Sequence, residues 1–255
     1  KDGLFPIFSN SYLVVLGEDI GVDYARYSND RAPQYRIKTE IVEKENGSKE
    51  VRKYPLTEEA KEHIANLATA YEGLVKRYEG SGLQINKCEL VDTNAEYYAS
   101  LEFVKGRPLS EFMDECLERQ DYEGFLKLFD KYLEYIGYNE EYPVADFDLV
   151  FSNIMIDGDT WTLLDYEWTF GKAVETKELA FRAVYCYLLE DEKRNALPLD
   201  SILDRLGITE KDAAIYREQE MDFQKFVTGK QLAMGEMREL IGGKIYEPHK
   251  WLHTI

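Results

Sequence analysis

The sequence has few of the residues that disulfide frameworks and zinc sites require. Only three of its 255 residues are cysteines, and they are widely spaced with no C-x-x-C pair, so we expect neither kind of site. There are three histidines and no H-E-x-x-H sequence, which leaves a hydrolytic zinc mechanism without support. This cysteine usage favours a reducing compartment, and we expect a cytoplasmic protein.

Positive charge is also in deficit. The chain has 31 lysine and arginine residues against 49 aspartate and glutamate residues, which gives a net charge of −18. Nucleic acids and anionic membrane surfaces repel a domain of this sign, so we expect neither as its partner. We expect no signal peptide and no membrane insertion, because no apolar run of transmembrane length is present. ATP remains a possible ligand, because a cleft can be locally basic.

The composition supports a folded core, since 44% of the residues are hydrophobic and 13% are aromatic. The length suits one large domain or two lobes. We predict strands over 12–16, 22–28, 35–42, 49–54, 83–91 and 96–104. Asn46-Gly47 is a strong hairpin signal before the fourth of these strands. Thr57 is a good N-cap for a helix that extends to about residue 77.

Beyond residue 108 the pattern becomes helical. We predict helices over 109–137, broken near Asp121, and over 176–191, 198–206 and 209–240, with Gly242-Gly243 ending the last. Two short apolar runs around Asp157-Gly158 predict a hairpin over 154–164. We therefore expect an α+β protein with a β-rich N-terminal lobe over 1–104 and a helical C-terminal lobe over 105–255.

Asp148, Asn153 and Asp165 form the most informative pattern, within the segment DFDLVFSNIMIDGDTWTLLDYEW (146–168). The first step is five residues and the second is twelve. An acid, an amide and a second acid at this spacing suit phosphoryl transfer, in which one acid accepts a hydroxyl proton and the other two groups hold Mg²⁺ on ATP. Acidic residues are abundant, so the spacing also arises by chance. The predicted hairpin between Asn153 and Asp165 favours the functional interpretation.

This pattern resembles the catalytic loop and metal-binding segment of the kinase-like superfamily, H-R-D-x-x-x-x-N followed by D-F-G. The likeness is closer to the aminoglycoside and choline kinase branch, whose second acid lies in an I-D-x-E sequence. The corresponding segment here is LDYE (164–167). The resemblance implies a bilobal protein-kinase-like fold and a kinase that uses ATP and Mg²⁺.

The resemblance also implies a role for each polar residue of the pattern. Asp148 would be the base that orients and deprotonates the acceptor hydroxyl. The metal ligands would be Asn153 and Asp165, with Glu167 taking a second metal or supporting the first. Asp146 stands where that branch usually has His, and it would orient the loop in place of that His.

A kinase lysine on a strand of the first lobe binds the ATP phosphates and pairs with a helix glutamate. Lys53 lies on the strand just before the predicted helix. Lys38 lies one strand earlier, which would leave the Asn46-Gly47 hairpin between it and the helix. We therefore prefer Lys53, and strand alternation then points Val51 the same way, where it could cover one face of the adenine.

The glutamate partner of Lys53 is not determined by the sequence. Glu59 flanks the apolar face of the helix, whereas Glu72 has the more kinase-like spacing but points away from that face. We choose Glu59, and solvent exposure remains the alternative for either residue. A glycine-rich phosphate loop is missing, so Arg31 in the loop 28–34 is our candidate for gripping phosphate oxygens. The alternative loop, 17–21, is acidic and would repel phosphate.

The segment LEFVKGRPL (101–109) resembles the hinge that joins the two lobes of a kinase. The resemblance implies that backbone groups near Glu102 and Val104 bond the adenine edge. Met155, two residues after Asn153, is placed to form the floor under the base. Ordinary core packing remains an alternative for these residues.

Four further segments resemble the kinase domains embedded in bacterial surface-polysaccharide enzymes, including those fused to methyltransferases that cap O-antigen chains. They are 8–14 (FSNSYLV), 28–31 (SNDR), 59–60 together with 63–64 (EA and HI) and 165–168 (DYEW). The resemblance implies phosphorylation of a sugar or glycan end in the cytoplasm, by a module of a larger protein with further domains as partners. Arg182 is a candidate for binding the acceptor or ordering the loop, although the sequence favours a surface salt bridge.

Two other interpretations stay open. A catalytically silent kinase-like module could serve as a scaffold within a larger glycan-assembly protein. The missing glycine loop and the missing His favour that interpretation, while the joint retention of Asp148, Asn153 and Asp165 disfavours it. A protein kinase has less support, because no A-P-E-like segment follows Asp165.

Overall fold

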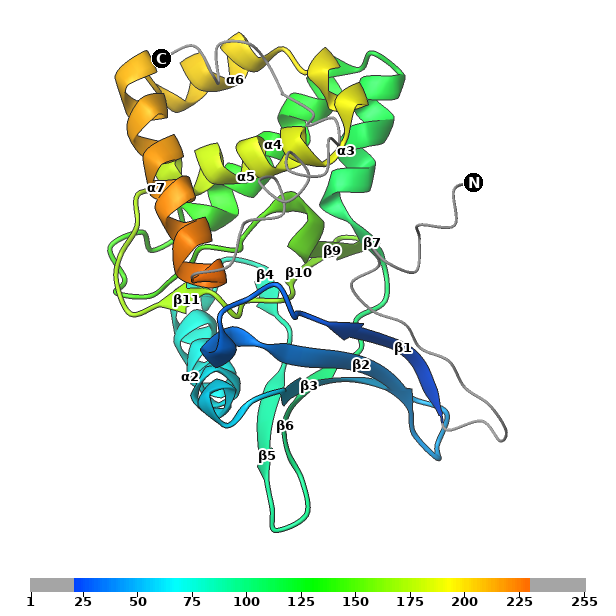
Figure 1. The fold of residues 1–255 in the computed structure, drawn as a ribbon. Helices are drawn as coiled ribbons and strands as arrows, with labels where there is room; N and C mark the ends of the chain where they lie inside the picture. The colour runs from blue at the N-terminus through cyan, green and yellow to red at the C-terminus, as the bar shows by residue number, and fades with distance from the viewer. Residues whose placement is uncertain (1–20, 230–255) are drawn as a thin grey trace, which may run out of the picture. The chain divides into compact units, whose positions relative to one another are not determined.

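The computed structural model describes residues 21–229. The strand predicted over 12–16, residues 230–240 of the last predicted helix and Gly242-Gly243 lie outside the described residues. The chain is mixed α/β, with a β-rich N-terminal part followed by helices (Figure 1). It divides into two compact units, which contain described residues 21–69, 87–103 and 225–229 in the first and 70–86 and 104–224 in the second.

The first unit contains a five-stranded antiparallel sheet in the order β1-β2-β3-β6-β5 (Figure 1). Its strands are β1 (Val22–Tyr27), β2 (Ile37–Glu43), β3 (Lys49–Pro55), β5 (Cys88–Asp92) and β6 (Tyr97–Glu102). A short 3₁₀ turn, η1 (Pro33–Tyr35), precedes β2 and accounts for the start of that strand two residues later than predicted. The predicted turn at Asn46-Gly47 joins β2 to β3. Gly47 has a φ of +76°, which residues other than glycine rarely adopt.

A helix follows β3, as the sequence predicts. The hydroxyl of Thr57 accepts a hydrogen bond from the Ala60 N–H at 3.2 Å, which caps the 3₁₀ turn η2 (Glu58–Ala60). The α-helix α2 (Lys61–Tyr78) continues from it, and Ile64 and Leu67 on its apolar face are almost fully buried. The chain passes from the first unit to the second within this helix.

The prediction of a single strand over 83–91 is wrong. The segment forms two strands, β4 (Leu83–Ile85) and β5, and these belong to different sheets. Asn86 lies between them and donates its backbone N–H to the Leu163 carbonyl at 3.0 Å. The reason is tertiary: β4 pairs in parallel with β10 (Thr160–Leu163), a partner far away in the sequence that local patterns do not reveal.

The second unit is mainly helical. Its helices are α3 (Leu109–Glu118), α4 (Tyr122–Ile136), α5 (Thr176–Glu190), η4 (Glu192–Ala196), α6 (Leu199–Leu206) and α7 (Glu210–Thr228), the last of which ends in the first unit. The predicted break near Asp121 is confirmed, because this carboxylate caps α4 by accepting the Gly124 N–H at 2.9 Å. The helices predicted over 176–191 and 198–206 are also confirmed within one residue at each end.

Two small sheets of the second unit contain parts of the motif of 146–168 or lie beside it. One has the order β4-β10-β9-β7, and the other pairs β8 with β11. The new elements are β7 (Arg107–Pro108), β8 (Ala145–Asp146), η3 (Phe151–Asn153), β9 (Ile154–Asp157) and β11 (Thr169–Phe170). The hairpin predicted around Asp157-Gly158 is confirmed as β9 and β10. Gly106 is required beside it, because any Cβ there would overlap the Ile156 carbonyl.

Arg77 anchors the chain that leads into β8. Its guanidinium is fully buried and donates to the Val144 carbonyl at 2.6 Å and to the Ile136 carbonyl at 2.9 Å. Buried carbonyls without a donor are costly, so this side chain satisfies the end of α4 and the entry to the motif together. The start of the motif is therefore held by a residue of α2.

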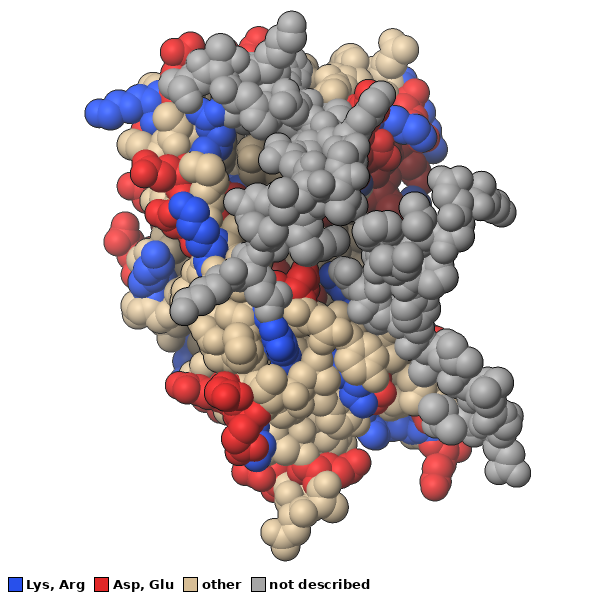
Figure 2. All heavy atoms as spheres, viewed as in Figure 1, with Lys and Arg blue, Asp and Glu red and all other residues tan. Residues whose placement is uncertain are grey.

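Figure 2 shows basic and acidic side chains interspersed on one face of the molecule, with no continuous basic area among the residues drawn in colour. Within residues 21–229, no helix combines the length and the apolar character that a membrane crossing requires.

Candidate active site in the second unit

The loop between β8 and β9 is held by aromatic side chains. Phe151, inside the short turn η3, is 1% exposed and meets the ring of Tyr132 edge-on at a centroid distance of 4.8 Å. The Tyr132 hydroxyl donates to the Leu149 carbonyl at 2.8 Å. Burial of one such side chain stabilises a fold by about 1.5–3 kcal/mol. The loop that carries Asp148 and Asn153 is thus fixed from below by packing.

Asp148 has one carboxylate oxygen held and the other presented. Oδ1 lies 3.1 Å from the Arg182 Nη1, whereas Oδ2 makes no hydrogen bond to the residues that the structure describes. The side chain is 23% exposed, so Oδ2 can accept a hydrogen bond from a bound molecule. The backbone N–H of Asp148 donates to Asp146 Oδ1 at 3.1 Å, which fixes the residue from its other side.

Asn153 is oriented by the same loop. Its Nδ2 donates to the Asp148 carbonyl at 2.9 Å. A carbonyl accepts only, so the amide nitrogen must face it and the amide oxygen must point the other way. Within the described part of the chain, no hydrogen bond engages that oxygen, which is a hard oxygen of the kind that Mg²⁺ prefers.

Asp165 and Glu167 follow β10 and are both partly exposed, while Tyr166 and Trp168 beside them are buried. Asp165 has a φ of +50°, a left-handed conformation that costs a non-glycine residue energy and often marks a functional site. The Leu164 N–H donates to the Asn153 carbonyl at 2.7 Å, which links this segment to the loop.

The electrostatics show that these acids lie near one another. Burial raises the pKa of Asp148 to about 6, the Arg182 guanidinium opposes this shift, and the carboxylates of Asp165 and Glu167 add to it. A pKa near 6 leaves this group ionised at neutral pH while giving it more affinity for a proton than an ordinary aspartate has. That is the combination expected of a general base.

Asp146 is fully buried, and burial raises its pKa well above the usual range, with the nearby Asp148 carboxylate adding to the shift. Its Oδ1 accepts the hydrogen bond from the Asp148 N–H and also lies 3.5 Å from the Thr169 hydroxyl. Asp146 and Thr169 are also paired between β8 and β11. The side chain therefore supports the loop from below.

The surface salt bridge that the sequence favours for Arg182 is wrong, because the residue is buried. The residue is 6% exposed on α5, and its Nη1 donates to the Phe147 carbonyl as well as to Asp148. Its Nε binds Glu220 Oε2 on α7 at 2.7 Å. Sequence patterns missed the role because both partners lie more than 30 residues away. The available signal was the position of Arg182 among apolar residues of α5, most of which are buried.

No group of three or more histidine, cysteine, aspartate or glutamate side chains within residues 21–229 is arranged to hold a metal by itself. Magnesium sites that also use substrate phosphates need only one or two carboxylates. An amide oxygen from Asn153 and carboxylates from Asp165 and Glu167 fit that kind of donor set.

In the first unit, the structure separates the two candidate lysines. Lys53 is 4% exposed and lies opposite Thr39 and Ala99 in the sheet. Lys38 is opposite Tyr54, on the other face, where its Nζ binds Glu40 at 2.8 Å. Val51 is two residues from Lys53 and shares its face, as predicted.

The other predicted nucleotide contacts are spread over both units. Glu59 is exposed at the start of the helix, Arg31 is partly exposed, and so are Val104 and Met155. Glu102 is exposed, and its backbone N–H is already bonded to the Lys87 carbonyl at 3.2 Å. Their roles stay predictions.

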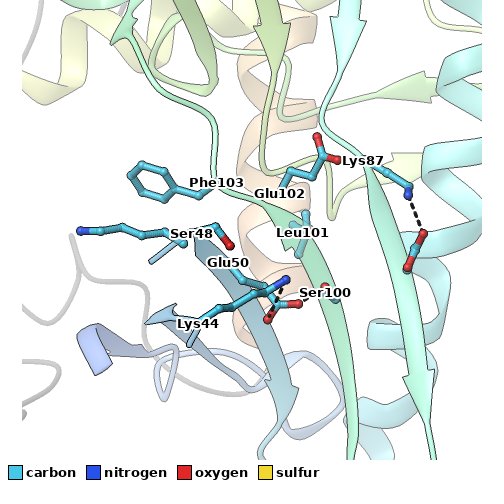
Figure 3. Close-up of a pocket in the computed structure, with 10 residues that line it drawn as sticks. Lys44, Ser48, Glu50, Lys87, Ser100, Leu101, Glu102 and Phe103 are labelled. Atoms are coloured by element: carbon cyan, nitrogen blue, oxygen red, sulfur yellow. Dashed lines mark hydrogen bonds and ion pairs between the residues drawn. The ribbon is translucent and has the colours of Figure 1, made fainter. Parts of the chain in front are cut away.

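A cavity of about 400 Å³ lies in the first unit beside β3, β5 and β6 (Figure 3). Its lysines already have acidic partners: Lys87 binds Glu89 at 2.6 Å, and Lys44 lies 3.6 Å from Glu50. The Glu50 carboxylate is in turn bonded to Ser100. The charges of these lysines are thus balanced by acids that also line the cavity. Among the predicted site residues, only Glu102 contributes to the lining.

No protein-family model matches this chain, and a search of curated proteins found no match to it. The chemistry of the site in the second unit therefore carries the functional argument. That site contains an aspartate with one accessible carboxylate oxygen, an amide oxygen and two partly exposed acids.

Proposed function

We propose that the protein is an ATP- and Mg²⁺-dependent phosphotransferase of bilobal, protein-kinase-like fold, acting on a hydroxyl group. The observation that carries the proposal is Asp148, whose Oδ1 is held by Arg182 while Oδ2 is left accessible. Asn153 and Asp165 supply the remaining groups that phosphoryl transfer needs.

Asp148 acts as the base. Its accessible Oδ2 would accept the hydrogen bond of the acceptor hydroxyl and take its proton as the acceptor oxygen bonds to the γ-phosphorus of ATP, the bond from that phosphorus to the β–γ bridging oxygen breaks and ADP leaves. General-base assistance of this kind contributes about 10²- to 10⁴-fold to a rate. The pKa of about 6, raised chiefly by burial, suits this task at neutral pH.

Asn153 and Asp165 would hold Mg²⁺ through the amide oxygen and a carboxylate, and Glu167 would bind a second metal or support the first. Mg²⁺ bound there would neutralise part of the charge of the ATP phosphates. The contribution of the chain is to fix the two oxygens: Asn153 through its hydrogen bond to the Asp148 carbonyl, and Asp165 through its constrained backbone.

We further propose the nucleotide contacts that the sequence predicts. Lys53 and Arg31 would bind the phosphates, and Glu59 would pair with Lys53. The predicted adenine contacts are Val51 and Glu102 of the first unit, and Val104 and Met155 of the second. The burial of Lys53 and the shared strand face of Lys53 and Val51 support this assignment.

For the acceptor, we propose a sugar or glycan end in bacterial surface-polysaccharide synthesis in the cytoplasm, with further domains of a larger protein as partners. The support is the resemblance of four sequence segments to such kinase domains. The acceptor would bind on the accessible side of Asp148.

A catalytically silent scaffold is the second candidate. Asp146 favours it, because a fully buried acid stands where the resembling kinases carry His. The accessible Oδ2 of Asp148 disfavours it, because a scaffold does not require a carboxylate oxygen that is open to a bound hydroxyl.

The test is ADP release from Mg-ATP with a panel of monosaccharides and short glycans. The wild-type protein should turn over with at least one acceptor, and the Asp148→Asn variant should lose that turnover while keeping its melting temperature. Nucleotide binding without turnover for any acceptor would support the scaffold. No nucleotide binding at all would refute the kinase proposal.

A further inference from the structure

The geometry points to Arg182 and Glu220 as positioning residues that decide which oxygen of Asp148 faces the acceptor. The inference rests on the proposed phosphotransferase function. Neither residue would touch the substrate; both would act through the base.

Arg182 binds the loop at two points with one nitrogen. Its Nη1 donates to Asp148 Oδ1 at 3.1 Å and also to the Phe147 carbonyl. Since Nη1 carries two hydrogens, both bonds form together. The carboxylate is therefore fixed relative to the backbone of its own loop, and Oδ2 becomes the presented oxygen.

Glu220 fixes the guanidinium itself. Its Oε2 accepts from Arg182 Nε at 2.7 Å, and its Oε1 accepts from Gln224 Nε2 at 2.7 Å, so both oxygens of this buried carboxylate are engaged. A guanidinium is a rigid plane, so holding Nε sets the direction of Nη1.

Two aromatic rings complete the clamp. The guanidinium carbon of Arg182 lies 5.0 Å from the ring centre of Phe147 and 4.9 Å from that of Phe223. Such contacts stabilise the cation and limit its rotation. The position of α7 is thereby coupled to the orientation of the base through Arg182.

The chain offers a matched control in Arg194. This arginine is also buried, also binds two acids and one backbone carbonyl, and also lies against an aromatic ring, that of Tyr187. Its acidic partners are Asp114 and Glu190, neither of which belongs to the motif of 146–168. Loss of Arg194 therefore removes a buried arginine without touching the base.

The first experiment compares Arg182→Ala, Arg182→Lys and Arg194→Gln in basal Mg-ATP hydrolysis and with any sugar that is active in the panel. For Arg182→Ala we expect kcat to fall about 100-fold, as for a misplaced catalytic group, with KM for ATP within about 3-fold of wild type. Millimolar guanidinium chloride should restore part of the rate, and sodium chloride at equal ionic strength should not. Arg182→Lys, which keeps the charge without the fork, should be intermediate and also covers the case in which Arg182→Ala does not fold.

Glu220→Gln tests the second residue of the clamp. It should lower kcat less than Arg182→Ala does, because the amide oxygen can still accept from Nε but without the charge. Arg194→Gln should leave kcat within about 2-fold of wild type under conditions where the variant is folded.

Hydrogen exchange of the amides of 147–153 gives a readout that needs no activity. We expect faster exchange in Arg182→Ala and unchanged exchange in Arg194→Gln. Unchanged kcat in Arg182→Ala, an equal loss in Arg194→Gln, or a loss without guanidinium rescue and without faster exchange would each overturn the inference. If wild type turns over no Mg-ATP, the proposed function fails, and unchanged exchange in Arg182→Ala would then overturn the inference on its own.

Discussion

Two buried arginines of the second unit are built alike and differ in one respect. Arg182 binds Asp148 and Glu220, and Arg194 binds Asp114 and Glu190. Around Arg194 both oxygens of the first acid are used: Nε and Nη2 bind Asp114 Oδ1 and Oδ2 at 2.8 and 2.9 Å. Around Arg182 only Oδ1 of Asp148 is used.

The difference separates a structural ion pair from a candidate catalytic one. Asp114 also accepts the Tyr187 hydroxyl at 2.6 Å, so its bonding serves to join α3, α5 and η4. Asp148 keeps an oxygen for a molecule outside the chain. An acid whose two oxygens are both bonded within the chain serves the fold, whereas an accessible oxygen with no partner among the described residues can accept a hydrogen bond from a ligand.

The largest expected effect comes from exchanging the two acids for their amides. Asp148→Asn should lower turnover about 10³- to 10⁴-fold, because the amide cannot take the proton of the acceptor hydroxyl. Asp114→Asn should leave turnover nearly unchanged and lower the melting temperature. ADP release and thermal unfolding of both variants check the pair. Equal loss of activity in the two variants would erase the distinction between the regions.

Arg194→Gln should destabilise the fold by about 2–3 kcal/mol, because it removes charge-assisted hydrogen bonds from a buried guanidinium to two acids that solvent still reaches. Chemical denaturation measures this free energy. Glu190 is largely exposed, so Asp114 should account for most of the loss. A loss below about 1 kcal/mol would mean that the pair is only a surface ion pair.

The free energy of unfolding should depend on pH through Asp148, by about 3 kcal/mol or less. Burial raises the pKa of Asp148 to about 6 in the folded chain. The ionised form is thus disfavoured in the native state, so stability is fully present below pH about 4 and is lost as the pH rises through about 6. Denaturation of the nucleotide-free protein between these values should show the loss in wild type and Asp114→Asn. Persistence of the same loss in Asp148→Asn would assign it to another group.

The smallest expected effect concerns Tyr187, which touches both regions. Its hydroxyl donates to Asp114, and its ring lies 5.4 Å from that of Phe151 in the loop that carries Asp148. Tyr187→Phe removes the hydrogen bond and keeps the ring, so it should cost about 1–2 kcal/mol and leave turnover unchanged. A drop in turnover with this variant would show that the Asp114 cluster also supports the loop.

Local signals predicted what depends on neighbours in the sequence. The turn at Asp157-Gly158, the break at Asp121 and the cap at Thr57 were all predictable, because each needs only nearby residues. The approach of Asn153 to Asp148 was predictable for the same reason, because the two residues are only five positions apart in the sequence.

Long-range partners could not be predicted in this way. The parallel pairing of β4 with β10 split a predicted strand, and the anchoring of the motif by Arg77 had no local signal. The role of Arg182 could not be predicted from its own helix, because its partner Glu220 lies on α7, 38 residues later in the sequence. The difference between Arg182 and Arg194 is visible only in the acids that they meet in space.

The most direct test of the account is calorimetric titration of a non-hydrolysable ATP analogue with and without Mg²⁺, in wild type, Asp165→Asn, Asn153→Ala and Asp148→Asn. The account predicts Mg²⁺-dependent binding in wild type and in Asp148→Asn, and binding weakened at least about 10-fold in the two metal-ligand variants, a typical effect of disturbing a metal site. Equal affinity in all four proteins, or binding indifferent to Mg²⁺, would contradict the assignment of Asn153 and Asp165 and with it the proposed phosphotransferase.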